Sequence, residues 1–304
     1  LLYAALGALA LTTPVTAQTN PTVYGSVVFG HEWEDMEAPP YGLYSMPADN
    51  GNAIKLEVRN DAIKANGGGV YIDGMYHLVD FTRYEFEQVV TFRTFDTKNN
   101  WKLINEQTIK SYNSAASDLT YDPVGDKIYG CFKETATSTQ YFLGTLNPIT
   151  GFASKIADID EELIVLASTR DGKLYGVGAY GMLYSVDKQT GKLTKIGQTG
   201  KSVKYSQSAT FDYASGRMLW AMTPHYTNES PELCEIDLST GKTTTLATIP
   251  ERYEFTGIYT LSPYAADNAP QTATAFGGKY EKGALSGTVS FTAPTATMGG
   301  STLS

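Results

Sequence analysis

Short apolar runs alternate with polar turns along most of this chain, and one such pattern occurs five times. Its clearest copy is LYSVDKQTGKLTKIG, residues 183–197. Equivalent windows of 15 residues begin at Leu43, Phe92, Leu143 and Leu233, and all five align without a gap. Because each window places a polar turn between two apolar runs, it predicts a β-hairpin.

The ninth position of the windows indicates how these hairpins turn. Glycine occupies it in four windows and asparagine in the fifth: Gly51, Asn100, Gly151, Gly191 and Gly241. Glycine adopts a positive φ without steric cost, and asparagine is the next best residue there. We therefore expect one backbone conformation in all five turns.

A second pair of strands precedes each hairpin. In the fourth repeat these strands are VLASTR from Val165 and KLYGV from Lys173, and the tight turn Asp171-Gly172 joins them. Similar pairs precede the other hairpins, except that the first repeat has one strand only. Each complete unit thus has four antiparallel strands, which we call a, b, c and d in chain order.

The spacing of the units selects the architecture. The windows start 49, 51, 40 and 50 residues apart, and propeller blades of four strands repeat about every 40 to 50 residues. A solenoid of hairpins is the alternative. The first unit lacks strand a, and a single strand, Thr256–Tyr264, follows the last unit. That strand can complete the first unit and close a ring without bare edges. The sequence predicts an all-β fold, a five-bladed β-propeller over residues 21–264.

Composition agrees with a turn-rich β protein that has a large core. The 304 residues are 42% hydrophobic and include 21 Tyr and 29 Gly. The net charge of −9 argues against binding to nucleic acid or an anionic membrane. Cys131 and Cys234 fall in blades that are not adjacent, so we expect two buried thiols and no disulfide.

The first 17 residues have the pattern of a secretory signal peptide. An apolar run from Leu1 to Leu11 precedes the small-residue site Val15-Thr16-Ala17. The run is shorter than the roughly 20 residues that span a membrane. We expect residues 1–17 to be part of a signal peptide whose start lies outside this sequence, and the protein to be exported.

The amino-acid composition and the repeat pattern change after Tyr264. Residues 265–278 read as a linker of small residues with a proline, and residues 279–304 begin another segment. In that segment Gly283–Ser286 (GALS) and Ser290–Pro294 (SFTAP) resemble the first strand of fibronectin type III-like domains in secreted, often surface-associated, Bacteroidales proteins. Such a sandwich needs about 100 residues, so we expect the sequence to stop inside it.

The propeller repeats, above all LYGVGAYGMLYSVDKQTGKLTKIG from Leu174, are also similar to those of exported Bacteroidetes propellers. This resemblance implies a secreted or cell-surface location and at least one further β-sandwich domain. It implies no shared activity.

Strand order predicts which face of the propeller binds a ligand. The short a–b and c–d turns share one face, which we call the turn face, and the variable b–c and d–a connections share the opposite loop face. Variable loops on a rigid scaffold are where binding concentrates. The candidate ligand-binding residues are loop-face aromatics: Trp33, Tyr41, Tyr84, Phe86, Tyr180 and Tyr226.

Carboxylates such as Glu32, Glu34, Glu229 and Glu232 alternate with these rings. Aromatic faces beside carboxylates suit sugar rings. They suit a protein partner equally well, because Trp and Tyr are common interface anchors. A third interpretation is that the rings only pack against neighbouring loops.

The catalytic candidates are weak. Glu32 and Glu34 alternate on one loop and could form the carboxyl pair of a glycosidase. His31 and His225 fall in loops of the neighbouring first and fifth blades, where they could add an acid/base pair or a metal site. His77 falls inside a strand and is predicted to be a core residue.

Three functional hypotheses follow. The leading one is an exported, non-catalytic binding module that holds a glycan or a protein on its loop face. The second is a glycan-active hydrolase or lyase that uses loop carboxylates, and the third is a structural spacer in a larger surface protein. No P-loop, Rossmann fingerprint, GxSxG or HExxH motif occurs, so we expect no cofactor and no metal.

Overall fold

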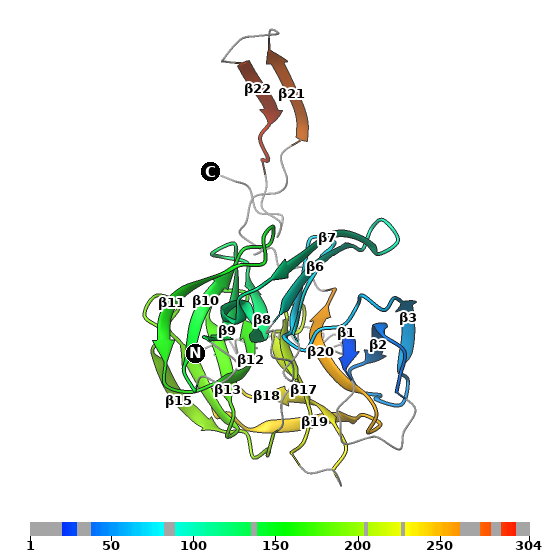
Figure 1. The fold of residues 1–304 in the computed structure, drawn as a ribbon, viewed down its shortest axis with the longest axis vertical. Coiled ribbons are helices and arrows are strands. Elements are labelled where there is room, and N and C mark those ends of the chain that lie inside the picture. Colours follow the sequence, from blue (N-terminus) through cyan, green and yellow to red (C-terminus); the bar gives the residue numbers. More distant parts are fainter. Residues whose placement is uncertain are drawn as a thin grey trace, which may run out of the picture.

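The computed structural model describes residues 20–28, 38–81, 89–134, 139–203, 206–225, 229–261, 274–280 and 287–295. These residues form five four-stranded antiparallel sheets arranged as a β-propeller (Figure 1), which confirms the predicted fold class. In Figure 1 the inner strands β8, β12 and β20 lie near the centre, and the outer strands β3, β7, β11 and β15 lie at the periphery.

The strands of the first three blades are as follows, in order from the inner to the outer strand. Blade 1 consists of β20 (Glu254–Thr260), β1 (Thr22–Val28), β2 (Gly42–Pro47) and β3 (Lys55–Arg59). Blade 2 consists of β4 (Gly69–Ile72), β5 (Met75–Phe81), β6 (Val90–Asp96) and β7 (Lys102–Ile109). Blade 3 consists of β8 (Ala116–Asp122), β9 (Lys127–Lys133), β10 (Tyr141–Leu146) and β11 (Ala153–Ile159). A short 3-10 helix, η2 (Tyr112–Ser114), precedes β8.

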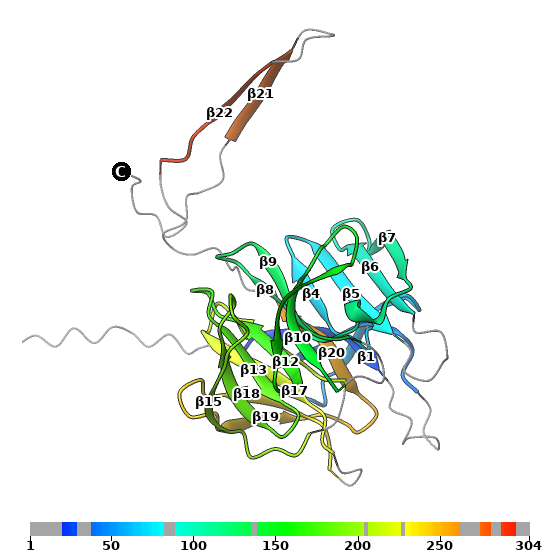
Figure 2. The ribbon, with the colours of Figure 1, turned by 60° about the vertical axis from the view of Figure 1, so that its left-hand side comes forward.

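Blade 4 consists of β12 (Leu163–Ser168), β13 (Leu174–Gly178), β14 (Met182–Val186) and β15 (Leu193–Gln198). Blade 5 consists of β16 (Ser208–Asp212), β17 (Arg217–Met222), β18 (Glu232–Ile236) and β19 (Thr243–Thr248). The remaining strands, β21 (Thr274–Tyr280) and β22 (Gly287–Thr292), form a two-stranded sheet apart from the blades (Figure 2). The fibronectin type III-like start of the next domain stays a prediction.

The ring closes as the sequence predicts. Strand β20 pairs antiparallel with β1, with Tyr259 opposite Tyr24, and so supplies the inner strand of blade 1. Inner strands of successive blades contact one another around the ring, from β4 through β8, β12, β16 and β20 back to β4. The first and last described strands of the propeller therefore share one sheet.

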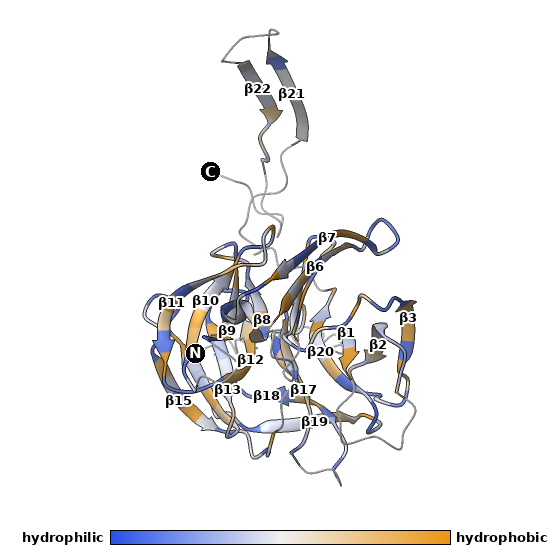
Figure 3. Ribbon diagram, viewed as in Figure 1, coloured by the Kyte–Doolittle hydropathy of each residue, from blue (hydrophilic) through white to orange (hydrophobic). Residues whose placement is uncertain are grey.

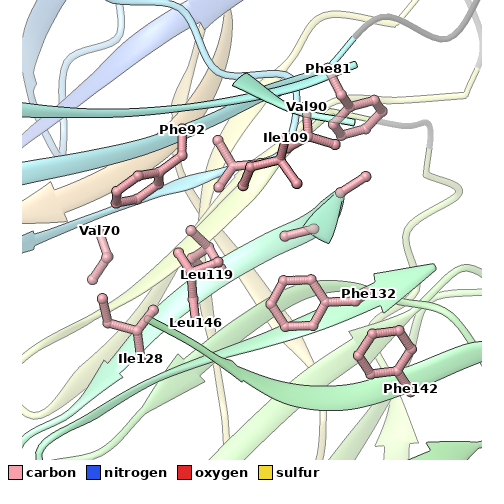
Figure 4. Close-up of a cluster of buried hydrophobic side chains, with 13 residues drawn as sticks. Val70, Phe81, Val90, Phe92, Ile109, Leu119, Ile128, Phe132, Phe142 and Leu146 are labelled. Atoms are coloured by element: carbon pink, nitrogen blue, oxygen red, sulfur yellow. The ribbon is translucent and has the colours of Figure 1, made fainter. Parts of the chain in front are cut away.

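The hydrophobic core consists of five clusters, one at each interface between neighbouring blades. Figure 4 shows the cluster between blades 2 and 3, where Phe92 and Phe81 face Phe132 and Leu119. Hydrophobic and hydrophilic positions alternate along the strands, and the outermost turns are mostly hydrophilic (Figure 3). Each blade is thus held by its two neighbours, because a single sheet cannot bury its own apolar faces and must pack them against other sheets.

The repeated windows occupy equivalent places in the five blades. The first residue of every window, Leu43, Phe92, Leu143, Leu183 or Leu233, is almost fully buried. In four blades the register between the two outer strands shifts directly after this leucine. In blade 2 the shift comes after Thr94. The alignment without gaps therefore reflects a packing position shared by all five blades and a bulge shared by four.

The turn glycines serve two purposes, and one prediction about them is wrong. Asn100, Gly151, Gly191 and Gly241 have positive φ as expected, but Gly51 is not among the residues with positive φ. A Cβ on Gly51 would lie 2.1 Å from the carbonyl oxygen of Thr248 in blade 5. Close approach of another blade, and not the turn conformation, requires glycine at this position.

Other predictions concern single residues and the membrane. Cys131 and Cys234 are buried free thiols, as expected, and burial raises the pKa of each to about 12. His77 is a buried residue on β5, also as expected. No helix in the described part of the chain is long and apolar enough to cross a membrane.

Candidate functional site

Most of the predicted loop-face site lies outside the described residues. This applies to the candidates His31, Glu32, Trp33, Glu34, Tyr84, Phe86 and Tyr226. Among the others, the Tyr41 ring lies 5.3 Å from the Lys64 ammonium, and Tyr180 is 84% exposed between β13 and β14. The backbone N–H of His225 donates to Ser202 O over 3.1 Å.

One loop-face carboxylate has a structural role. Glu232, at the start of β18, forms an ion pair with Lys201 and accepts a hydrogen bond of 2.8 Å from Thr245 Oγ1. Burial alone would raise the pKa of Glu232, but Lys201 and Thr245 outweigh it and lower the pKa. A carboxylate held ionised in this way is a poor general acid.

A buried carboxylate ties the inner strands together at the propeller axis. Asp118 Oδ2 on β8 accepts backbone hydrogen bonds from Leu166 of β12 (3.2 Å) and Ala209 of β16 (3.0 Å). Its Oδ1 accepts a hydrogen bond of 2.9 Å from Ser208 Oγ, which in turn accepts one of 3.0 Å from the backbone N–H of Ile258 on β20. We call these residues the axial network.

Blade 2 also reaches the axial network. Gly68 precedes β4, and a Cβ at this position would lie 2.8 Å from Asp118 Oδ1. Asp118 is fully buried, and this burial raises its pKa to about 8 although its hydrogen bonds with Ala209, Leu166 and Ser208 lower it. The network therefore fills the axis where all five blades meet.

A cavity of about 250 Å³ lies on the turn-face side of this network, and we call it the axial well. Most of its lining comes from the inner strands β20, β4, β8 and β16, between the axial network and the turn face. Gly69 and Leu119 come directly after the network residues Gly68 and Asp118, whereas Ala209 and Ile258 belong to the network, and these four residues form the inner end. The strands then run toward their a–b turns, so the well opens on the turn face.

Aromatic rings and hydroxyl groups form the wall of the well. Tyr71 stacks on Tyr259 with ring centroids 4.7 Å apart. The other aromatic lining residues are Tyr121, Phe211 and Tyr213, and three threonines alternate with them: Thr120, Thr210 and Thr260. This mixture of apolar faces and hydroxyl groups is typical of small-molecule sites.

Two tyrosine hydroxyls at the well are neutral and held in place by hydrogen bonds. Tyr121 Oη donates to Asp126 Oδ1 over 2.8 Å, and Tyr213 Oη donates to the carbonyl of Ser168 over 3.3 Å. Burial raises the pKa of both hydroxyls, and the neighbouring carboxylates of Asp126 and Asp122 raise it further. The rings are therefore fixed walls that stay uncharged at neutral pH.

Two polar groups at the well, the Thr210 hydroxyl and the Lys98 ammonium, can form hydrogen bonds with a ligand. Within the described ranges, neither the Thr210 hydroxyl nor the Lys98 ammonium has a side-chain partner. The Lys98 side chain crosses the a–b turn of blade 2, since a Cβ on Gly74 would lie 2.6 Å from its Cε. Asp73, in the same turn, also borders the opening.

A second hollow of about 470 Å³ adjoins the well, and we call it the inter-blade groove. It lies between the turn-face ends of blades 2 and 3. Its apolar lining is Ile72, Met75, Ile128, Leu146 and Pro148, and its polar lining is Asp73, His77, Tyr121, Asp126, Lys127, Thr145, Asn147 and Ser154. Asp73 and Tyr121 line both hollows.

The sequence contained one signal for the well that the loop-based interpretation passed over. An aromatic residue occurs near the end of strand a in four of the five blades, at Tyr71, Tyr121, Phe211 and Tyr259. Blade 4 has Ser168 in this region instead. For metals, the described part of the chain holds no group of three or more His, Cys, Asp or Glu side chains that could bind one.

Comparisons with known proteins give structural likeness at low sequence identity. No protein-family model matches the chain, and no curated protein sequence matches it. TolB from Acinetobacter baumannii has a TM-score of 0.44 at 13% identity, covering 77% of this chain and 54% of its own, so this chain spans about half of that protein. XC5397 from Xanthomonas campestris, described as a gluconolactonase, has a TM-score of 0.43 at 12% identity, covering 78% of each chain.

An auxiliary nutrient binding protein from Bacteroides ovatus has a TM-score of 0.37 at 12% identity, with 86% of this chain and 57% of that chain covered. The proteins that resemble this chain thus have diverse functions, and the likeness concerns the fold alone.

Proposed function

We propose that this chain is an exported, non-catalytic binding propeller that holds a carbohydrate ring in the axial well. The observation that carries the proposal is the lining of the well, where Tyr71 and Tyr121 contribute aromatic rings beside threonine hydroxyls. Sugar rings stack their C–H faces on aromatic rings and exchange hydrogen bonds with hydroxyl groups.

The size of the well supports a small ligand. Pockets for drug-sized molecules span about 300 to 1,000 Å³, and the well, at about 250 Å³, is slightly smaller. A single sugar ring fits a well of this volume better than a peptide segment does. The free hydroxyl of Thr210 and the ammonium of Lys98 supply donors for ring hydroxyls.

Export and a cell-surface location rest on the signal-peptide pattern of residues 1–17 and on the resemblance of the repeats to exported Bacteroidetes propellers. The loop face, with Trp33 as its strongest anchor, is the competing location for the same ligand class. A test must therefore compare the two faces.

We expect Tyr71→Ala to weaken polysaccharide binding about tenfold, equal to about 1.4 kcal/mol, because it removes one stacking wall of the well. Residues 18–264 would be run in affinity gels that contain soluble polysaccharides, and release of reducing ends would be recorded in parallel. Trp33→Ala is the matched loop-face variant, and it should leave retardation unchanged.

Loss of retardation in Trp33→Ala but not in Tyr71→Ala would move the site to the loop face. Release of reducing ends would instead favour a glycan-active hydrolase or lyase and direct attention to Glu32 and Glu34. Absence of both signals for every polysaccharide would refute carbohydrate binding and leave a protein partner or a spacer role.

A further inference from the structure

We propose that the axial well and the inter-blade groove form one extended site that recognises the end of an oligosaccharide, with the terminal ring in the well and the next rings in the groove. This inference rests on the proposed function and adds the mode of binding. Because the well and the groove would bind different rings of the ligand, the contribution of each hollow can be tested separately.

The two hollows adjoin at a fixed wall. Tyr121 and Asp73 line both of them. The Tyr121 ring is anchored at its far end, because its hydroxyl donates to Asp126 Oδ1 over 2.8 Å. A ligand that leaves the well along this ring enters the groove between blades 2 and 3.

The well admits only a chain end because the axial network closes it. Asp118 accepts hydrogen bonds from β12 and β16, and Ser208 links the same carboxylate to β20. Leu119 and Ala209 adjoin this network and line the inner end of the well. A polysaccharide therefore cannot pass through the propeller axis, and an internal unit of a chain has no second exit from the well.

The groove has the chemistry and the room for further sugar rings. At about 470 Å³ it is nearly twice as large as the well. Ile72 and Met75 provide apolar surface, whereas Lys127 and Thr145 provide polar groups. His77 also lines the groove, and burial lowers its pKa to about 4, so it is a neutral ring at physiological pH. Apolar surface with a few polar groups is the combination that small-ligand sites use.

Two threonines give a matched pair of variants. Thr210 on β16 lines the well and Thr145 on β10 lines the groove, both are partly buried, and neither hydroxyl has a hydrogen-bond partner among the described residues. Replacement by valine keeps the shape and removes one hydroxyl. Removal of one hydrogen bond to a ligand weakens binding about two- to tenfold.

The experiment measures dissociation constants by titration calorimetry for residues 18–264 with glucose, cellobiose and cellotriose. The same measurement is made for the one- to three-unit series of β-1,4-linked xylose and of α-1,4-linked glucose. We expect the second unit to tighten binding at least tenfold in the series that binds. Thr210→Val should weaken mono-, di- and trisaccharide by the same factor, whereas Thr145→Val should weaken only the di- and trisaccharide.

Tyr180→Ala on the loop face is the control, and we expect it to bind every sugar as the unchanged protein does. Sugar binding that does not depend on chain length, or equal weakening of the monosaccharide by both Thr→Val variants, would overturn the extended site and leave the proposed function intact. Failure of every series to bind, together with the absence of polysaccharide retardation, would overturn both.

Discussion

Gly241→Ala should destabilise the propeller by about 3 kcal/mol or more, whereas Gly216→Ala in the same blade should cost only about 1 kcal/mol. Both glycines close tight turns of blade 5, with φ of 79° and 72°. Both donate a similar backbone hydrogen bond, from Gly241 to Asp237 O (2.7 Å) and from Gly216 to Asp212 O (2.8 Å). Alanine at positive φ costs about 1–2 kcal/mol in either turn.

The two turns differ in what surrounds them. A Cβ on Gly216 meets nothing within 4 Å, whereas a Cβ on Gly241 would lie 2.5 Å from the backbone oxygen of Gly197 in blade 4. Backbone cannot rotate away as a side chain can, so blade 5 has to move outward from blade 4. Overpacking of this kind adds about 1–3 kcal/mol to the cost of the turn.

Thermal and urea unfolding, followed by circular dichroism, measure both variants. In a domain of this size about 1 kcal/mol corresponds to roughly 2–4 °C in Tm, so Gly241→Ala should melt several degrees below Gly216→Ala. Equal melting temperatures would show that the spacing between blades 4 and 5 is adjustable, and that turn conformation alone keeps glycine at position 241.

The contrast also shows what the sequence could and could not predict. The alternation within each repeat and the terminal strand together predicted five blades and their closure, because these are local patterns repeated at regular spacing. The close approach of Gly197 to Gly241 was not predictable, because the two residues belong to different blades. The same holds for Gly51, where the close approach of Thr248 from another blade requires glycine.

The candidate site was less predictable than the fold. Loop composition directed attention to Trp33 and Tyr226, whereas the well is built from strand residues such as Thr210 and Tyr259 whose segments look like ordinary core. Asp118 stands in DLTYDP, the segment predicted to form strand a of the third unit. Only the ring places it beside Ala209, 91 positions further along the chain.

Asp118 should make the propeller more stable as the pH falls from 8 to 6.5, by roughly 1 to 2 kcal/mol. Its pKa is about 8 in the folded protein, mainly because it is buried, and about 4 in an unfolded chain. The folded state therefore holds a proton that the unfolded state lacks in this range. The resulting stability is complete below the unfolded pKa and is lost as the pH rises through 8.

His77 opposes this effect at lower pH. Burial lowers its pKa to about 4, against about 6.5 when unfolded, so its contribution to stability is lost as the pH falls from 6.5 toward 4. Between pH 5 and 6.5 the pH-dependent contributions of Asp118 and His77 to stability should nearly cancel in the unchanged protein. His77→Gln, which retains a polar group beside Thr94 Oγ1, should then show stability that rises continuously from pH 8 to 5.

Asp118→Asn is the decisive variant. Asparagine resembles the protonated acid, since its amide oxygen can accept from Leu166 and Ala209 while its N–H group donates to Ser208 Oγ. The amide has one more N–H than the acid has O–H, and burial of that group without a partner costs about 1–3 kcal/mol. The pH dependence is more informative. In Asp118→Asn the free energy of unfolding, measured with urea, should stay constant from pH 8 to 6.5 and decrease below pH 6.5, where His77 alone titrates. An unchanged slope between pH 8 and 6.5 in Asp118→Asn would assign the proton to another group. Asp118, beside the inner end of the well, would then be an ionised carboxylate that its hydrogen-bond donors stabilise.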